Sequence, residues 1–180
     1  MRIITGIAKG RRLTGPEGSA TRPPTDRMRE AVFSSLGNAV VDAVVLDLYA
    51  GTGSFGLEAL SRGASAATFV ERDRAALRTL RANIEAVGLG GRVVAADVEV
   101  ALAGETGWYG LVFVDPPYRL ASSALEGVLA AVSELLSDGA IILVHRRRDE
   151  VEAATPGTLA LTRRRRYGDA EIWWYEKETR

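Results

Sequence analysis

The sequence contains no cysteine and a single histidine among its 180 residues. The absence of cysteine excludes disulfide bonds, a thiolate nucleophile and a cysteine-ligated metal site. One histidine cannot build a histidine-rich metal cluster, so we expect no metal cofactor. Long apolar runs are missing too, since the longest, such as residues 140–144, have the length of a buried strand rather than of a membrane span. The first residues lack the apolar stretch of a signal peptide, so we expect a cytoplasmic protein with no membrane partner.

Net charge is also absent, because 23 basic residues balance 23 acidic ones. The charges are nevertheless unevenly distributed along the chain. Residues 1–30 carry seven Lys and Arg against three acids, residues 31–145 carry seven against 13, and residues 146–180 carry nine against seven. Basic ends around an acidic middle favour a polyanionic partner, because local patches matter more than the total charge. Arginine-rich ends are also common on ordinary solvated surfaces, so the charge alone leaves both interpretations open.

The hydrophobic pattern predicts one α/β domain. Apolar segments of strand length alternate with helical patterns from residue 43 onward, which is typical of a parallel sheet covered by helices on both faces. We expect strands at residues 43–48, 66–70, 92–96, 111–114, 140–144, 159–167 and 171–176. Gly168-Asp169 is a hairpin-turn pair, so the last two strands should be antiparallel. The predicted fold is therefore a Rossmann-like, doubly wound sheet of seven strands.

Helix signals lie between these strands. Helices are expected at residues 25–36 and 54–62 and between the later strands. Asp73 is placed to cap one helix that Gly88 ends, and Ser123 with Glu126 predicts a capping box for another.

The N-terminal part has a different character. Residues 3–13 read as a small hairpin, and a loop rich in Gly, Pro and Ser follows up to Pro24. We therefore divide the chain into an N-terminal extension, residues 1–24, and a main domain, residues 25–180.

Four carboxylates follow the predicted parallel strands. Ligands of such sheets bind outside the carboxyl ends of the strands, near the point where the strand order reverses. The acidic residues at those ends are Asp47, Glu71, Asp97 and Asp115.

A glycine loop follows the first of these strands. Gly51 and Gly53 allow the backbone to approach a ligand closely, and with Gly56 they formally match a dinucleotide fingerprint. Asp47 just before the loop would repel a pyrophosphate but attract the ammonium of a methionyl group. The sequence therefore favours S-adenosylmethionine over a nicotinamide dinucleotide.

On that interpretation each acidic strand end has a role. Glu71 would accept hydrogen bonds from the ribose hydroxyls, and Asp97 would accept one from the adenine amine. An ordinary helix cap is the alternative role for Asp97. Tyr49 or Phe55 would pack near the cofactor.

The segment Asp115-Pro116-Pro117-Tyr118 directly follows an apolar strand. Its prolines lack backbone donors, which leaves carbonyl oxygens facing the cavity. The Asp115 carboxylate and the Pro116 carbonyl could hold both hydrogens of an exocyclic base amine, directing its lone pair at a methyl donor. Tyr118 offers a flat face for an extruded base. His145 is expected to be structural, because no acid–base step needs it.

These segments resemble the bacterial 16S ribosomal RNA guanine-N2 methyltransferases of the RsmD type. The matching stretches are residues 1–6, 9–13, 22–33, 46–54, 69–71 and 115–118. The resemblance implies a class I methyltransferase fold, S-adenosylmethionine as cofactor, and transfer to N2 of the guanine conventionally numbered 966 in 16S rRNA. It also implies a small-subunit or assembly particle as partner, and an N-terminal extension that holds RNA; we expect a monomer.

Basic residues in the N-terminal part agree with that expectation. Those placed to contact phosphates are Lys9, Arg11, Arg12, Arg22 and Arg27. Thr25 and Arg29 could instead touch the methionyl end of the cofactor. The run Arg163-Arg164-Arg165-Arg166 departs from the family pattern, and either an RNA contact or a solvated sheet edge would explain it.

Three other functions are weighed against this one. A DNA adenine-N6 methyltransferase uses a similar Asp/Asn-Pro-Pro-Tyr motif, but 180 residues leave no room for a DNA-recognition domain. A non-catalytic RNA-binding assembly factor on the same fold is disfavoured by the intact acidic strand ends. A nicotinamide dehydrogenase is the most distant alternative.

Overall fold

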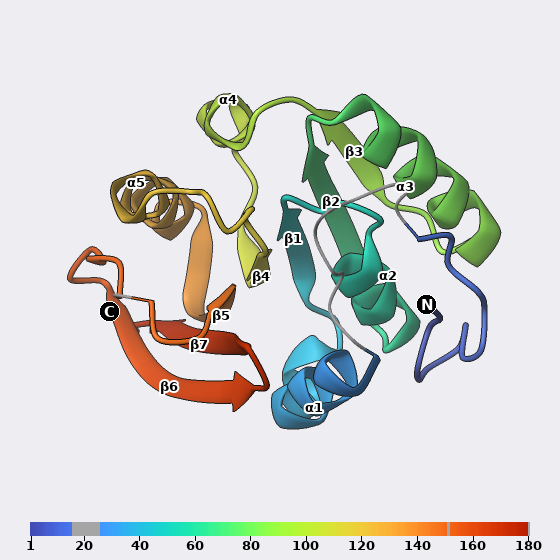
Figure 1. Cartoon of the computed structure of the whole chain (residues 1–180), viewed down its shortest axis with the longest axis horizontal. Helices are drawn as coiled ribbons and strands as arrows, with labels where there is room; N and C mark the ends of the chain where they lie inside the picture. The colour runs from blue at the N-terminus through green and yellow to red at the C-terminus, as the bar shows by residue number, and fades with distance from the viewer. Residues whose placement is uncertain (16–25, 151, 180) are drawn as a thin grey trace.

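The computed structural model describes residues 1–15, 26–150 and 152–179. Within that part of the chain a seven-stranded sheet has the order β3-β2-β1-β4-β5-β7-β6. The pairs β1–β2, β1–β4, β2–β3 and β4–β5 are parallel, and β7 is antiparallel to both β5 and β6. The strand order reverses between β1 and β4, so the ligand-binding edge lies at the carboxyl ends of those two strands. This is the predicted fold class, with the antiparallel final hairpin in place (Figure 1).

The elements follow the hydrophobic pattern of the sequence. The strands are β1 (Val44–Leu48), β2 (Ala66–Glu71), β3 (Arg92–Ala95), β4 (Tyr109–Val114), β5 (Leu136–Arg147), β6 (Leu159–Tyr167) and β7 (Ala170–Lys177). The helices are α1 (Asp26–Leu36), the 3-10 turn η1 (Gly37–Val40), α2 (Ser54–Ser61), α3 (Arg74–Val87), α4 (Val98–Gly104) and α5 (Ser122–Ser133).

Two local predictions differ from the structure. The strand expected at residues 140–144 extends over the whole of β5, because its far end pairs with β7 as far as Arg147. The capping box was wrong: α5 begins after Ala121, and Glu126 accepts instead from the backbone N–H of Ala154. The caps of α3 are confirmed, since the Asp73 carboxylate accepts from the N–H of Ala76 and Gly88 is left-handed.

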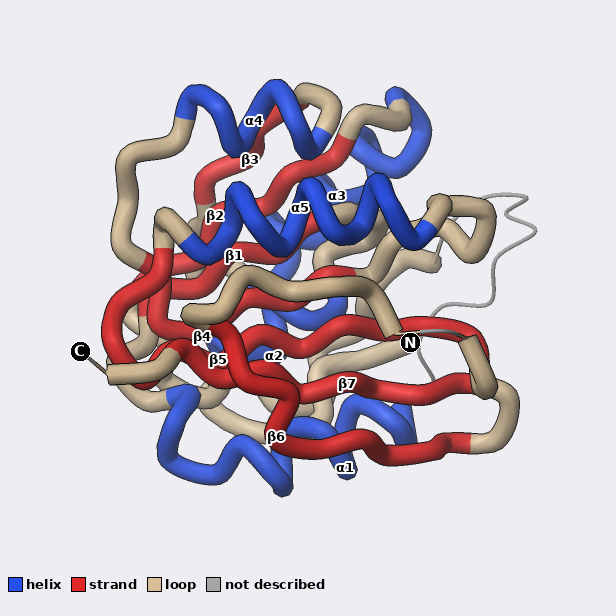
Figure 2. The backbone as a smooth tube through the Cα atoms, turned by 90° about the vertical axis from the view of Figure 1, so that its left-hand side faces the viewer, coloured by secondary structure: helices blue, strands red, loops and turns tan. Residues whose placement is uncertain are grey.

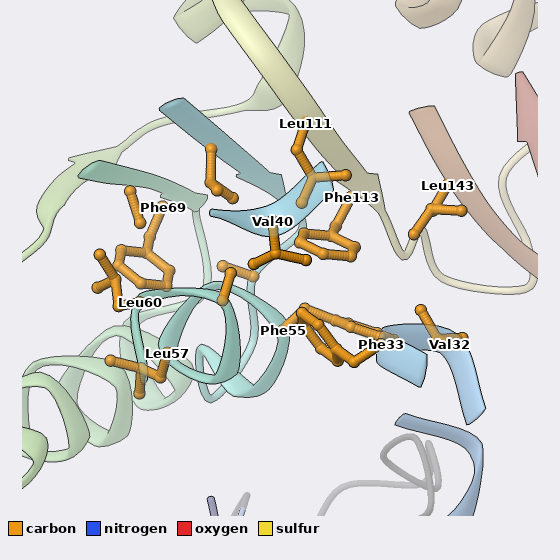
Figure 3. Packing of buried hydrophobic residues seen from close by; sticks show 14 of the residues in the cluster. Val32, Phe33, Val40, Phe55, Leu57, Leu60, Phe69, Leu111, Phe113 and Leu143 are labelled. Atoms are coloured by element: carbon orange, nitrogen blue, oxygen red, sulfur yellow. The ribbon is translucent and has the colours of Figure 1, made fainter. Parts of the chain in front are cut away.

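Apolar side chains fill both faces of the sheet. One cluster lies under α1, α2 and α3, and the other lies under α4 and α5. In the first cluster Phe33, Phe55 and Phe113 form an aromatic group, with ring centroids of Phe55 and Phe113 4.9 Å apart (Figure 3). Phe113 is two residues before Asp115, so this packing stiffens the end of β4 at the predicted site. Figure 2 shows the helices on both sides of the strands.

The N-terminal hairpin is held by buried polar groups of α2. Its strands meet in one antiparallel bridge, between Arg2 and Arg12. Glu58 is fully buried, and its carboxylate accepts from the backbone N–H groups of Ile4 and Thr5. Ile3 is fully buried in the cluster under α2 and α3. Residues 1–15 therefore extend the main core instead of packing on their own; the boundary at Pro24 lies outside the described residues.

No helix in residues 1–15, 26–150 or 152–179 is long and apolar enough to cross a bilayer.

Candidate active site

A cavity of about 420 Å³ lies at the carboxyl ends of the parallel strands. This volume falls in the range of small-molecule sites, about 300–1,000 Å³. Its walls come from the loops after β1, β2, β3 and β4. Every acidic strand end that the sequence singled out faces it: Asp47, Glu71, Asp97 and Asp115.

Asp47 lies near the end of β1 and is almost completely buried. One oxygen, Oδ2, accepts from the N–H of Gly56 at 2.9 Å. Burial, together with the nearby charges of Asp115 and Glu71, raises the pKa of Asp47 well above its usual value, although the Gly56 hydrogen bond opposes this. A buried carboxylate with such a pKa gains stability from a cationic ligand, because the ligand supplies the missing counter-charge.

The loop between β1 and α2 has a left-handed backbone at three positions, Tyr49, Gly51 and Gly53. Gly51 lines the cavity, and its N–H donates to Glu71. Gly53 does not line it: a Cβ there would lie 2.5 Å from the Leu80 side chain. Gly53 is therefore required for packing against α3. Of the two glycines predicted to let the backbone approach a ligand, only Gly51 lines the cavity.

Glu71 and Asp97 face the cavity from the ends of β2 and β3. The Glu71 carboxylate accepts from the N–H groups of Gly51, Arg72 and Asp73, which fixes its orientation. Asp97 precedes α4, but its side chain makes no capping hydrogen bond; it accepts from Arg72 at 2.6 Å. The alternative of an ordinary helix cap is thus wrong for Asp97, whereas its role toward a ligand is still a prediction.

Tyr49 adds an aromatic wall and an unpaired polar group. It lines the cavity, and its hydroxyl is buried with no hydrogen-bond partner in the described part of the chain. Burial raises the pKa of Tyr49 to about 12, so the hydroxyl is neutral and able to donate to a ligand. Phe55 also lines the cavity.

Asp115 follows β4 with its side chain turned to the cavity. Its Oδ1 lies 2.6 Å from Nδ1 of His145, which leaves Oδ2 for a ligand. Pro116 and Tyr118 line the same wall. Burial raises the pKa of Tyr118, and the guanidinium of Arg147 lies 5.6 Å from its ring centroid. A carboxylate, a proline turn and an aromatic face thus meet at one end of the cavity.

His145 is the site residue that sequence reasoning missed. It lines the main cavity and a second one of about 10 Å³ among apolar side chains, and its Nε2 is buried without a partner among the described residues. The contact arises from the strand register: β4 and β5 pair at Val114 and Val144, so the next residues, Asp115 and His145, lie side by side.

The cavity is strongly acidic. Among the described residues six carboxylates line it, and Arg72 is the one Lys or Arg that does so. The carboxylates are Asp47, Glu71, Asp73, Asp97, Glu99 and Asp115. Such a lining attracts a cationic ligand and repels a pyrophosphate. In residues 1–15, 26–150 and 152–179, no group of three or more acidic or histidine side chains is arranged to hold a metal ion.

Comparison with known proteins agrees with this geometry. The family model described as conserved hypothetical protein 95 matches residues 1–176. The chain is 37% identical to the ribosomal RNA small subunit methyltransferase D of Escherichia coli K12, over 99% of the chain and 90% of that protein. The chain belongs to the RsmD family. The putative rRNA methyltransferase YlbH of Bacillus subtilis is 38% identical over 98% of the chain and 99% of its own length.

Solved structures of methyltransferases have the same fold as this RsmD-family chain. The putative methyltransferase yhhF from Escherichia coli superposes with a TM-score of 0.87 at 37% identity, covering 100% of the chain and 99% of that structure. TrmN from Thermus thermophilus superposes with a TM-score of 0.70 at 25% identity, over 83% of the chain and 48% of that protein. The fold is therefore that of the class I methyltransferases, as predicted.

The predicted RNA-contacting residues of this RsmD-family chain are distributed over more than one surface. Lys9, Arg12 and Arg27 are exposed, as RNA contact requires. Arg11 is exposed too, but its guanidinium donates to the carbonyls of Ala86 and Val87 at the end of α3, at 2.8 Å each. That end is opposite to the start of α3, where Asp73 and Ala76 line the cavity. Arg11 thus lies away from the cavity and also caps a helix.

Arg29 contacts neither the cavity nor solvent. It is fully buried, and its guanidinium donates to the carbonyls of Ser54 and Arg2 and to the carboxylate of Asp26. The cofactor contact considered for Arg29 is not made by this buried side chain, which instead joins the N-terminal hairpin to α1 and α2. Arg22 and Thr25 lie outside the described residues.

Proposed function

We propose that this protein transfers a methyl group from S-adenosylmethionine to the exocyclic N2 of a guanine in small-subunit ribosomal RNA. The observation that carries the proposal is the position of Asp115. Its carboxylate lies at the end of β4, on the wall of the acidic cavity, with one oxygen bound to His145 and the other free of hydrogen bonds from the described residues. The names of the relatives, ribosomal RNA small subunit methyltransferase D and putative rRNA methyltransferase, support the substrate class.

The residues of the cavity fit S-adenosylmethionine at each end. Asp47 supplies a buried carboxylate for the ammonium of the methionyl group. Glu71 is held by three backbone donors and keeps acceptor capacity for ribose hydroxyls, because a carboxylate has about four lone-pair sites. Asp97 lines the far end for the adenine amine, and Tyr49 packs along the wall. When bound, the cofactor supplies an electrophilic methyl group on a positively charged sulfur.

Asp115 and Pro116 prepare the base amine for attack. The nitrogen lone pair of an exocyclic amine is delocalised into the ring, so the free amine is a poor nucleophile. The Asp115 Oδ2 and the Pro116 carbonyl each accept one amine hydrogen, which turns the lone pair toward the methyl group. Within the described residues no backbone N–H donates to the carbonyl of Pro116. The carbonyl of Pro117, by contrast, accepts from the backbone N–H of Leu120. The acceptor at Pro116 is therefore available to a substrate.

The same two oxygens stabilise the transfer. Transfer would form an N–C bond as the S–C bond of the bound sulfonium breaks, so positive charge would develop on the amine nitrogen. The Asp115 carboxylate faces that charge from a fixed position, which lowers the barrier without reorganisation. The nitrogen then loses one proton, and Asp115 Oδ2 is placed to accept it. Tyr118, half-exposed at the cavity mouth, supports the extruded base by stacking.

The catalytic proposal is tested with labelled S-adenosylmethionine and three substrates: small-subunit particles lacking the modification, protein-free 16S rRNA, and duplex DNA. We expect labelled N2-methylguanosine from one or both ribosomal substrates and none from DNA, with transfer lost in Asp115→Ala. Label in N6-methyladenine would support the adenine-N6 alternative. RNA binding without S-adenosylmethionine binding would support the non-catalytic assembly factor. Guanine 966 of 16S rRNA is the position we expect, and the protein should act in the cytoplasm as a monomer.

A further inference from the structure

Arg165 lies in the same row of the sheet as His145. His145 of β5 pairs with Ile172 of β7, and Ile172 pairs with Arg165 of β6. Directly paired residues of antiparallel strands point to the same face. With strands about 4.8 Å apart, the backbone of Arg165 is about 10 Å from that of a residue lining the cavity. The Arg165 guanidinium reaches Ser35 of α1 at 2.6 Å, so this is the α1 side of the sheet (Figure 1).

Two more arginines share this face. Arg163 precedes Arg165 by two residues, and its guanidinium lies 5.0 Å from the ring centroid of Trp174, which belongs to the cluster under α1. Arg147 follows His145 by two residues and lies over Tyr118 at the mouth of the cavity. Stacking on an aromatic ring occupies the flat face of a guanidinium and leaves its N–H donors at the edge. All three arginines are exposed.

In the described part of the chain these three guanidinium groups have no acidic partner. No carboxylate there lies within 4.0 Å of the guanidinium of Arg147, Arg163 or Arg165, and the one contact of Arg147 with Glu150 is made by its backbone N–H. The arginines on the opposite face of the same strands are all paired. The pairs are Arg146 with Glu150, Arg164 with Glu152, and Arg166 with Asp149 and Glu171.

We propose that Arg147, Arg163 and Arg165, the unpaired arginine face, bind phosphates of the RNA that flank the target base. This inference rests on the proposed function, because it takes RNA as the substrate of the adjacent cavity. A purely solvated edge gives no reason for acids to neutralise one face and not the other. A polyanion does, since guanidinium groups that no carboxylate neutralises bind phosphate oxygens in a bidentate manner.

RNA fits this face better than an acidic peptide. The face begins at Tyr118, where a base would be extruded, and continues along β6, so a strand leaving the cavity would meet successive guanidinium groups. Exposed Arg27 is about two turns of α1 from Ser35, which contacts Arg165. A partner that enters the cavity and crosses this face must carry both a planar base and a row of anionic groups.

The experiment compares two double variants of β6. Arg163→Ala with Arg165→Ala removes two unpaired arginines, and Arg164→Ala with Arg166→Ala removes two paired ones from the same strand, with the same change in net charge. Affinity for 16S rRNA transcribed in vitro is measured over a series of salt concentrations, S-adenosylmethionine binding by calorimetry, and association by size-exclusion chromatography.

We expect the 163/165 variant to bind the RNA about tenfold more weakly, with a salt slope smaller by about 1.4 because two phosphate contacts are lost. The 164/166 variant should keep its slope, and both should bind S-adenosylmethionine as the wild type does. An equal loss of RNA affinity in both variants would show that only the long-range effect of net charge matters, and it would overturn the proposal. Unchanged RNA affinity with self-association of the 163/165 variant would also overturn it, in favour of edge protection. Methyl transfer by the wild type is measured separately, so a failure of the proposed function can be distinguished from a failure of this RNA-binding proposal.

Discussion

Nδ1 of His145 lies 2.6 Å from Oδ1 of Asp115, and both side chains face the cavity. An ionised carboxylate only accepts hydrogen bonds, so the Nδ1–H of His145 donates to Oδ1 of Asp115. Nε2 is buried and has no partner among the described residues, so the imidazole cannot pass a proton onward to another group. His145 therefore fits a positioning residue, which holds one oxygen of Asp115 so that the other meets the substrate.

This positioning role predicts different kcat values for two substitutions at position 145. The side-chain nitrogen of Asn takes approximately the place of Nδ1, whereas that of Gln reaches toward the place of Nε2. We expect His145→Asn to keep most of the wild-type kcat. His145→Gln should lose at least about tenfold in kcat, because a misdirected catalytic group loses the benefit of orientation. The affinity for S-adenosylmethionine should stay unchanged in both variants. Equal kcat values in steady-state assays would contradict the role.

Asp115 is predicted to act on the transfer and not on cofactor affinity. Asp115→Asn keeps the size of the side chain, but it replaces a charged acceptor by a neutral amide. We expect kcat to fall by about 10²–10³, the loss typical of removing one preorganised electrostatic group. The dissociation constant for S-adenosylmethionine, measured by calorimetry, should change by less than about twofold. A variant with unaltered kcat would remove Asp115 from the mechanism.

Asp47 gives a pH-dependent prediction. Burial raises its pKa in the folded protein above the unfolded value of about 4. Such a group favours folding at low pH, and that stability is lost as the pH rises through the unfolded and then the folded pKa. Asp47→Asn removes the buried charge and can still accept from Gly56. We therefore expect the ligand-free variant to have the same unfolding temperature as the wild type, within error, below about pH 4. At pH 7 its unfolding temperature should be a few degrees higher.

The same variant should bind S-adenosylmethionine more weakly, because the ammonium loses its counter-charge. Thermal unfolding over a pH series, with and without the cofactor, measures both effects. A ligand-free variant less stable than the wild type at neutral pH would mean that Asp47 is stabilised by the protein itself and is not kept for a ligand.

Alanine substitutions at two glycines test whether the N-terminal hairpin is attached to α2. Gly6 and Gly10 both have a left-handed backbone, with φ of 89° and 84°. A Cβ at Gly6 would lie 1.7 Å from the carbonyl oxygen of Ser61, whereas a Cβ at Gly10 meets nothing within 4 Å. Gly10→Ala should cost about 1–2 kcal/mol of unfolding free energy from the backbone alone. Gly6→Ala should cost at least about twice that, measured by urea unfolding; equal losses would show that the hairpin is not fixed against α2.

The acidic strand ends could be predicted from the sequence because parallel strands fix where their carboxyl ends meet. Asp47, Glu71, Asp97 and Asp115 each follow an apolar run, and no tertiary detail is needed to bring them to one edge. The parallel sheet and the antiparallel final hairpin were predicted from the same pattern, whereas the order of the strands was not. His145 could not be recognised in this way, because its role depends on the register between β4 and β5.

Buried charges were harder to predict. Arg29 and Glu58 both look like surface residues of amphipathic helices, yet both are fully buried. Each also binds a backbone group of the hairpin more than 25 positions away in the sequence, and local periodicity carries no information about such contacts. The arginines of β6 alternate between faces as a strand requires, but only the folded chain shows which face the acids neutralise.

Base-resolved mapping of methylated guanines in 16S rRNA tests the central claim most directly. The RNA is compared between cells that carry the gene, cells that lack it, and cells that produce only the Asp115→Ala protein. We predict that one N2-methylguanine is present in the first strain and absent from both others. Loss of a modification other than N2-methylguanine, or a full level of it with the Asp115→Ala protein, would contradict the mechanism derived from this cavity.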